Sequence, residues 1–191
     1  RDGKDYEFPR RLMTLKANAS IEGVFDGGAD EVVVNDSHGT QRNLLPEFLD
    51  PRAQVITGSP KPQSMMAGLD DSFGAVLCVG YHARAGSQGI LDHTISSQAV
   101  YDIKINGDSQ GEMGLNAGIA AYYGVPIVLL TGDSTATAQA VELVPEIEVA
   151  TVKESLTRYA AKNLSPSASQ ELIRRQSKLA VERREIGRAH V

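Results

Sequence analysis

The chain has 191 residues, 41% of them hydrophobic, and a formal net charge of -5. That length is enough for one well-buried domain, whose folding removes roughly 70% of the unfolded chain's surface from solvent. The acidic balance, without any Lys/Arg-rich block, excludes the electrostatic surface that nucleic acids and anionic membranes require. No run approaches the ~18 apolar residues of a membrane-spanning helix. We therefore expect neither a nucleic-acid nor a membrane partner.

Cys78 is the only cysteine, and it lies inside the apolar run 75–80. In such a position a thiol is typically a small buried side chain rather than a nucleophile. A lone cysteine cannot form a disulfide within the chain, which suits a reducing compartment. Because the start also carries no signal-peptide pattern, we expect a cytoplasmic protein.

The first half of the chain alternates between helical and strand patterns. Apolar residues recur at helical spacing over 9–25, and Gly27-Gly28 stops the helix. Short apolar segments then predict strands at 32–34, 54–57 and 75–80. Residues 44–49 predict a helical turn. Tyr122, Tyr123 and the Met65-Met66 pair are assigned to core packing rather than to an interface.

The second half continues this alternation. Residues 99–105 alternate as a half-exposed strand does, and Asn106-Gly107 is a tight-turn signal, so we expect a small antiparallel subregion in the middle of the chain. The remaining expected elements are a helix at 111–123, a strand at 125–130, a helix capped by Ser134 and ending near 143, a strand at 147–152 and a polar helix at 166–184. The prediction is a single α/β domain over 1–184 with a largely parallel sheet flanked by helices; 185–191 is assigned to a non-native tail.

Two histidines share one context, the end of an apolar strand. His38 follows the strand ending near Val34, and His82 follows the strand ending near Gly80. In open α/β sheets, catalytic groups gather beyond the carboxyl ends of strands, so these two side chains can converge. His93 comes eleven residues after His82, and Glu112 opens a predicted helix. Imidazole nitrogens and a carboxylate oxygen are suitable ligands for zinc.

Each of these residues also has a plainer structural role. A histidine past a strand is often a hydrogen-bonded loop residue, and a glutamate in the first helical turn interacts with the helix dipole. Asp36 and Asp133 are assigned to capping of turns or helices. The signatures of phosphate-binding loops, dinucleotide sites, zincins and serine hydrolases are absent from the sequence. The spacing of the residues alone therefore leaves the choice open.

Several ordered motifs resemble the bacterial DppA-type D-aminopeptidases, over residues 6–175: Asn-Asp-Ser-His38-Gly, Gly-Leu-Asp-Asp-Ser-Phe at 68–73, Gly-Tyr-His82-Ala-Arg-Ala, His93 and Gly-Glu112-Met-Gly-Leu-Asn-Ala. The resemblance implies a pair of zinc ions with His38, His82 and Glu112 as ligands, and His93 as a catalytic residue. We assign His93 an acid/base or transition-state-stabilising role. The implied activity is removal of N-terminal D-amino acids, such as D-Ala, from short peptides by a metal-activated water.

The resemblance has one departure and leaves alternatives. Members of the family begin with a strand ending in Asp-x-Glu-Gly that supplies further metal ligands, and no such segment precedes Tyr6. We therefore expect the domain to lack its first strand, and the chain as given to be poorly metallated or inactive. The family also implies a homo-oligomer, a decamer. The alternatives are a non-catalytic peptide- or metal-binding homologue and a metal-dependent amidohydrolase acting on a different amide.

Overall fold

The computed structural model describes residues 5–187, and the side chains of residues 5–184. The chain divides into two compact units. Unit 1 combines the N-terminal part up to Asp70 with the C-terminal part from Pro166, and unit 2 comprises Asp71–Ser165. The single domain expected over 1–184 stays a prediction. Of the expected tail at 185–191, the last four residues lie outside the described residues.

Helices, strands and two short 3-10 helices (η) alternate along the chain. In order they are α1 (Glu7–Asp26), β1 (Val33–Asn35), η1 (Pro46–Phe48), β2 (Gln54–Ile56), η2 (Ser64–Met66), β3 (Val76–Tyr81), β4 (Ile103–Ile105), β5 (Asp108–Gln110), α2 (Glu112–Tyr122), β6 (Ile127–Asp133), α3 (Ser134–Leu143), β7 (Glu148–Thr157), β8 (Ala160–Asn163) and α4 (Pro166–Gly187).

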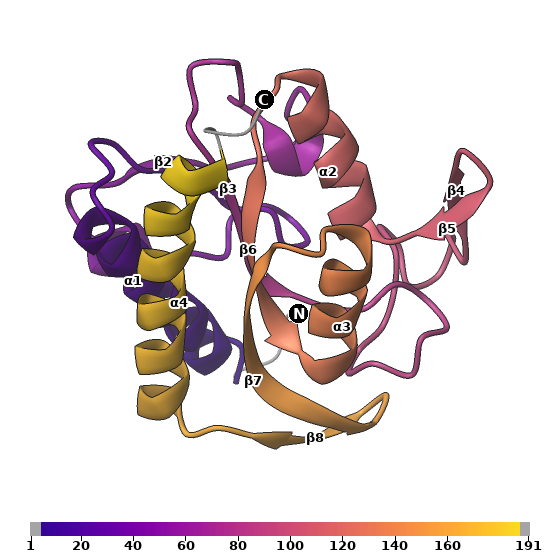
Figure 1. Ribbon diagram of the computed structural model, residues 1–191. Helices are drawn as coiled ribbons and strands as arrows, with labels where there is room; N and C mark the ends of the chain where they lie inside the picture. The colour runs from indigo at the N-terminus through magenta and orange to yellow at the C-terminus, as the bar shows by residue number, and fades with distance from the viewer. Residues whose placement is uncertain (1–4, 188–191) are drawn as a thin grey trace. The chain divides into compact units, whose positions relative to one another are not determined.

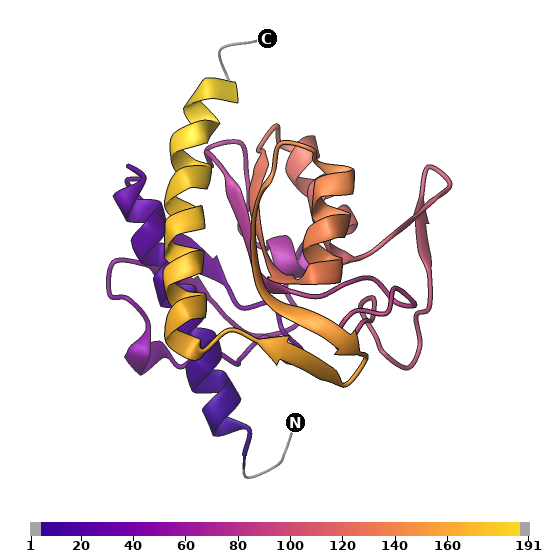
Figure 2. The same ribbon diagram turned by 60° about the horizontal axis from the view of Figure 1, so that its bottom comes forward.

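Unit 1 is built around two helices from opposite ends of its sequence. Figure 2 shows α1 and α4 side by side. Their interface is close enough for the buried hydroxyls of Ser20 and Ser177 to hydrogen-bond at 2.9 Å. Ile21 of α1 and Ile173 of α4 are buried. The short strands β1 and β2 form a separate parallel pair in this unit.

Gly23 allows the close approach of α1 to α4, and we predict that Gly23→Ala destabilises the protein. An added Cβ would lie 2.1 Å from the Arg174 carbonyl oxygen and 2.8 Å from Ser177 Cβ, so one helix must shift. Overpacking of this kind costs roughly 1–3 kcal/mol of the free energy of unfolding, which urea titration measures.

The matched control is Gly118→Ala in α2, an exposed position where an added Cβ meets nothing within 4 Å. Because alanine has the higher helix propensity, this variant should be stabilised by up to about 1 kcal/mol. Equal effects of the two substitutions would mean that the α1–α4 contact is not tight.

Unit 2 contains a four-stranded sheet in the order β3-β6-β7-β8. The first three strands are parallel, and β8 pairs antiparallel with β7 at the edge. Helices α2 and α3 lie beside this sheet (Figure 1). Central strand β6 is almost wholly buried, including Leu129 and Leu130, as expected for a strand covered on both faces.

The small antiparallel subregion is confirmed as the two-stranded ribbon of β4 and β5, which projects from the rest of unit 2 (Figure 1). Its turn is Asn106-Gly107, with φ angles of 55° and 96°, the left-handed conformations that a tight hairpin turn requires. The strand expected over 99–105 forms only at 103–105.

The predicted fold class is therefore confirmed: an α/β chain with a mostly parallel sheet and a small antiparallel sheet. Two details were wrong or missed. The N-cap of α3 is Asp133, whose carboxylate accepts the Ala136 N–H, and Ser134 is the first helical residue. The end of β7 and all of β8 were not predicted, because their exposed, polar residues form no apolar run.

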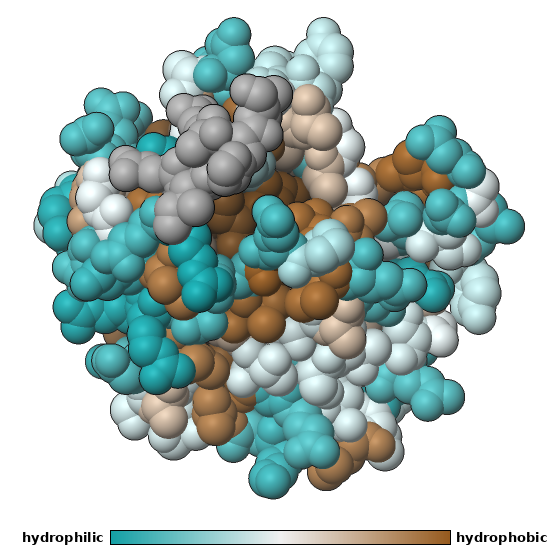
Figure 3. All heavy atoms as spheres, in the orientation of Figure 1, coloured by the Kyte–Doolittle hydropathy of each residue, from teal (hydrophilic) through white to brown (hydrophobic). Residues whose placement is uncertain are grey.

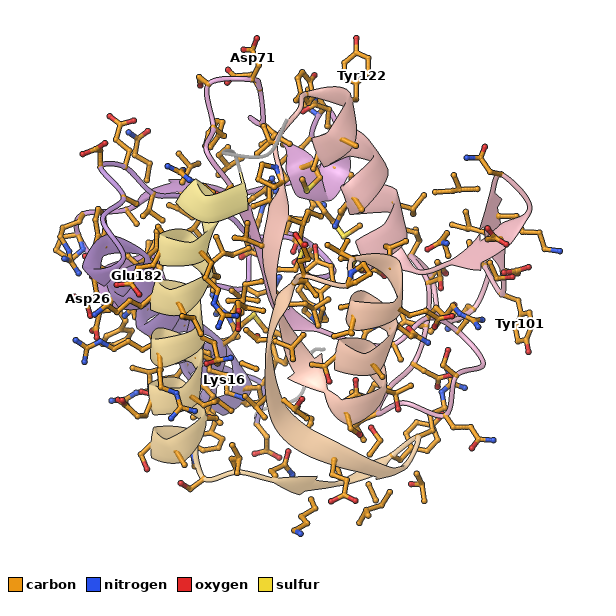
Figure 4. All side chains as sticks on the ribbon, in the orientation of Figure 1. Lys16, Asp26, Asp71, Tyr101, Tyr122 and Glu182 are labelled. Atoms are coloured by element: carbon orange, nitrogen blue, oxygen red, sulfur yellow. The ribbon has the colours of Figure 1, made fainter. Side chains whose placement is uncertain are left out.

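Burial tests three further expectations. Cys78 is buried in β3, and burial raises the pKa of its thiol to about 12, so the expectation of an unreactive thiol is confirmed. Met66 is buried as expected, but Tyr122 is 82% exposed and points outward at the end of α2 (Figure 4), so its assignment to the core was wrong. Among the described residues, no helix combines the length and apolar content that a bilayer span needs.

Candidate metal centre

Three of the four predicted site residues converge within unit 2. His82 lies just past the carboxyl end of β3, Glu112 is the first residue of α2, and His93 lies in the loop between them. The Nε2 atoms of His82 and His93 lie 3.5 Å and 3.7 Å from the same Glu112 Oε1. The two imidazole rings stack with centroids 3.8 Å apart and planes 19° from parallel. All three side chains are mostly buried.

Backbone carbonyls fix the tautomers of both histidines. His82 Nδ1 lies 3.0 Å from the Ala83 carbonyl oxygen, and His93 Nδ1 lies 2.8 Å from the Leu91 carbonyl oxygen. A carbonyl oxygen has no proton to give, so each Nδ1 carries the hydrogen and donates it. In the neutral rings the lone pairs are therefore on the two Nε2 atoms, which both face Glu112.

The loop that carries His93 folds back onto the end of β3. The His93 N–H donates to the Ala83 carbonyl at 3.3 Å, which places His93 beside His82 although eleven residues separate them. Gly89 makes this return possible, because an added Cβ would lie 2.6 Å from Ala83 Cβ and 2.9 Å from Asp133 Oδ2. Sequence spacing alone does not specify this return.

Buried Asp133 anchors the same loop. Its Oδ2 accepts the Ile90 N–H at 3.0 Å and the Ser155 hydroxyl, while Oδ1 caps α3. The Ile90 N–H also reaches Ser155 Oγ at 2.8 Å. The capping role expected for Asp133 is confirmed, and its second role was missed. The position of Asp133 at the end of a buried strand was the one available signal.

The far side of the loop is held by Glu112 itself. The Ile95 N–H donates to Glu112 Oε1 at 2.8 Å. Leu91 and Ile95, on either side of His93, have φ angles of 53° and 61°, a left-handed conformation that is unusual for bulky and β-branched side chains. A left-handed conformation of this kind is kept only where surrounding contacts hold the backbone in place, as they do at functional sites.

His82 and Glu112 shift one another's protonation. Burial opposes the charged form of each, but attraction between the two groups outweighs it, so the pKa of His82 is raised and the pKa of Glu112 is lowered. In the metal-free protein, the raised His82 pKa stabilises the fold at low pH, and this contribution is lost as the pH rises through the folded-state value. The lowered Glu112 pKa gives a contribution that is lost as the pH falls.

We predict that the pair stabilises the metal-free protein most between the ordinary pKa values of glutamate, about 4.3, and histidine, about 6.5. The measurement is urea unfolding of the chelator-treated wild type and Glu112→Gln across this range and above it. The difference in the free energy of unfolding between them should be largest inside the window and shrink toward higher pH. A difference independent of pH would contradict a charged His82–Glu112 pair.

The three donors fit a zinc ion. Their ligand atoms all lie within 4.8 Å of one another. Tetrahedral zinc with bonds of about 2.05 Å holds its ligand atoms about 3.3 Å apart, close to the two N–O distances measured here. The donor set of two imidazole nitrogens and one carboxylate oxygen matches the zinc sites of hydrolases. The observed geometry is equally suited to His93 as a ligand or as a group beside the metal.

The fourth predicted residue, His38, belongs to unit 1. It lies in the turn after β1, where its carbonyl accepts the Gln41 N–H at 2.7 Å, and its side chain is exposed. Neighbouring Asp36 is buried and accepts the Leu44 N–H at 2.8 Å, which confirms its expected capping role. His38 as a metal ligand stays a prediction from its motif.

Comparison with known proteins places this site in context. Residues 1–190 match the peptidase family described as D-aminopeptidase. The chain is 41% identical over 182 residues to the D-aminopeptidase of Bacillus subtilis (strain 168), covering 95% of this chain and 66% of that protein. A solved structure of the Zn-dependent D-aminopeptidase DppA from Bacillus subtilis, called a self-compartmentalizing protease, matches with a TM-score of 0.93, 41% identity and the same coverage. The chain thus spans less than two thirds of that relative's length.

Proposed function

Because the chain belongs to the D-aminopeptidase family, we propose that it forms part of a zinc-dependent enzyme that removes N-terminal D-amino acids, such as D-Ala, from short peptides. The convergence of His82, His93 and Glu112 within 4.8 Å is the observation that carries this proposal. The similarity to the Bacillus subtilis enzyme supports the same activity.

The roles of the three residues follow from their surroundings. Zinc, when bound, supplies a Lewis acid for the scissile carbonyl and lowers the pKa of a water molecule. His82 and Glu112 would hold it: the Nδ1 bond of His82 directs the Nε2 lone pair inward, and Glu112 contributes the negative charge. His38 stays the third predicted ligand, and a second zinc ion stays a prediction from the family resemblance.

His93 is assigned the proton-transfer role. Its Nε2 carries the lone pair and faces Glu112, and its Nδ1 bond to the Leu91 carbonyl fixes the ring. An imidazole so held can take a proton from the attacking water and return it to the leaving amine.

The test is hydrolysis of D-Ala-D-Ala and L-Ala-L-Ala by the full-length protein, with Zn²⁺ and after treatment with a chelator. Zinc-dependent cleavage of the D-dipeptide alone is the expected result. Cleavage of other amides but neither dipeptide would favour an amidohydrolase, and metal binding without any cleavage would favour a non-catalytic homologue.

We further propose that the protein is a cytoplasmic homo-oligomer. Two observations support association: the projecting β4–β5 ribbon displays hydrophobic residues among hydrophilic ones (Figure 3), and large aromatic side chains such as Tyr101 and Tyr159 are strongly exposed. The Bacillus subtilis relative is called self-compartmentalizing, which implies an assembly of that protein. Mass measurement by light scattering tests the proposal; the family predicts a decamer, and a monomer would contradict it.

A further inference from the structure

A cavity of about 570 Å³ adjoins His93 within unit 2. It is bounded by the segment from Ala85 to Tyr101 and by the end of β7 with the turn after it, Ser155–Arg158. Its volume falls in the range of roughly 300–1,000 Å³ that small-molecule sites occupy. Small residues line part of it, namely Ala85, Gly86, Ser97, Ala99, Ser155 and Thr157, and its larger apolar or aromatic residues are Val100, Tyr101 and Leu156. Such a lining leaves room for a short peptide with small side chains.

Arg158 is the permanently charged cation of this lining, and it is held in one orientation. Its Nε lies 2.9 Å from Asp92 Oδ1, and its Nη2 donates to the Asp92 carbonyl at 3.0 Å. Asp92 is 5% exposed and also accepts the Ser87 N–H at 3.1 Å, so this carboxylate is fixed from two sides. The Arg158 carbonyl in turn accepts the Leu91 N–H at 2.8 Å.

This arrangement uses only part of the guanidinium. Of its five N–H groups, one on Nη2 donates to the Asp92 carbonyl, and the one on Nε lies at the ion-pair contact with the Asp92 carboxylate. The other N–H groups have no acceptor among the residues that the structure describes, and the side chain is 46% exposed. A guanidinium that is oriented on one edge and open on the other is suited to bind a carboxylate.

We propose that this cavity receives the part of the substrate beyond the scissile bond, and that Arg158 binds the free carboxylate at the peptide's C-terminus. The inference rests on the proposed function. His93, which handles the scissile amide, lines the same cavity as Arg158 and follows Asp92 directly, so the scissile amide and the C-terminal carboxylate of a short peptide each have a partner. Because residues of an extended peptide span only ~3.3–3.6 Å each, the carboxylate of a dipeptide lies close to its scissile bond. The site thus selects short peptides with a free C-terminal carboxylate.

The test compares D-Ala-D-Ala with its C-terminal amide, D-Ala-D-Ala-NH2, which lacks the negative charge. A charge-assisted hydrogen bond is worth enough for wild-type full-length enzyme to favour the free acid by roughly tenfold or more in kcat/KM. Arg158→Gln should reduce this preference to about one, and Arg158→Lys should keep part of it. Lys162→Gln is the matched control, because it removes a positive charge of unit 2 at a residue outside the cavity lining.

Two outcomes would overturn the proposal: a wild-type enzyme that does not distinguish acid from amide, or an Arg158→Gln enzyme that loses activity toward both equally. The second result would mean that Arg158 only holds the loop of His93. If the wild type hydrolyses neither substrate, the proposed function fails. Ligand-detected NMR on the metal-free protein then decides the carboxylate site alone: N-acetyl-D-alanine should bind the wild type and Lys162→Gln better than Arg158→Gln, and equal binding to all three would refute it.

Discussion

Replacing Glu112 with glutamine in the full-length protein is expected to abolish zinc binding and D-peptide hydrolysis together. Glutamine keeps an oxygen that can accept the Ile95 N–H, so the loop of His93 should keep its anchor. It lacks the negative charge with which Glu112 would hold a dication beside His82. Loss of a group that only supports a metal ligand costs 10–100-fold in affinity, so loss of the ligand's charge should cost roughly 100-fold or more.

Zinc content after dialysis and the rate of D-Ala-D-Ala hydrolysis are the two measurements for Glu112→Gln. Glu142→Gln is the matched control, since it makes the same chemical change at an exposed position of α3. The control should bind zinc and hydrolyse the peptide as the wild type does. Full zinc content in Glu112→Gln would remove this residue from the ligand set.

The second large effect is expected for His93→Asn. Asparagine can still donate to the Leu91 carbonyl, where His93 Nδ1 now does, but it has no atom in place of Nε2. If His93 transfers protons, kcat should fall by roughly 10²–10⁴-fold while zinc content stays near the wild-type value. Rate measurements and metal analysis on the same preparation give kcat and the zinc content.

His82→Asn is the comparison variant that distinguishes a metal ligand from a proton-transfer group. It makes the same change in the stacked partner ring, where Asn can keep the bond to the Ala83 carbonyl and again lacks Nε2. This variant should lose zinc as well as activity. Should His93→Asn lose zinc to the same extent, His93 is a ligand, and its assignment as the proton-transfer group is wrong.

The sequence alone predicted the elements whose residues repeat with a clear period. The helix near 9–25 and the buried strands β3 and β6 were expected because apolar side chains recur at helical spacing or form β-branched runs. The Asn106-Gly107 turn was predicted because few other residue pairs adopt two left-handed conformations in succession. These features depend on residues close together in the chain, so local chemistry determines them.

Edge structure and loop paths were not predictable in this way. Strand β8 pairs antiparallel with the extended end of β7, and both are mainly exposed and polar, so no hydrophobic pattern marks them. The loop through His93 is held by Asp133, Ser155 and Arg158, which come from 40 or more residues further along the chain. Contacts over such separations leave no periodic signal in the sequence.

The candidate site was also predictable only in part from the sequence. Position past a strand end selected His38 and His82, closeness in sequence to His82 selected His93, and position at a helix start selected Glu112; the ordered motifs connected all four with the D-aminopeptidases. Only the tertiary structure brought His82, His93 and Glu112 within 4.8 Å, fixed both Nε2 lone pairs toward one carboxylate oxygen, and placed the Asp92–Arg158 pair beside them. The reason is physical: the choice of donor atoms is a property of single residues, whereas their separation and tautomers depend on hydrogen bonds that close only in the folded chain.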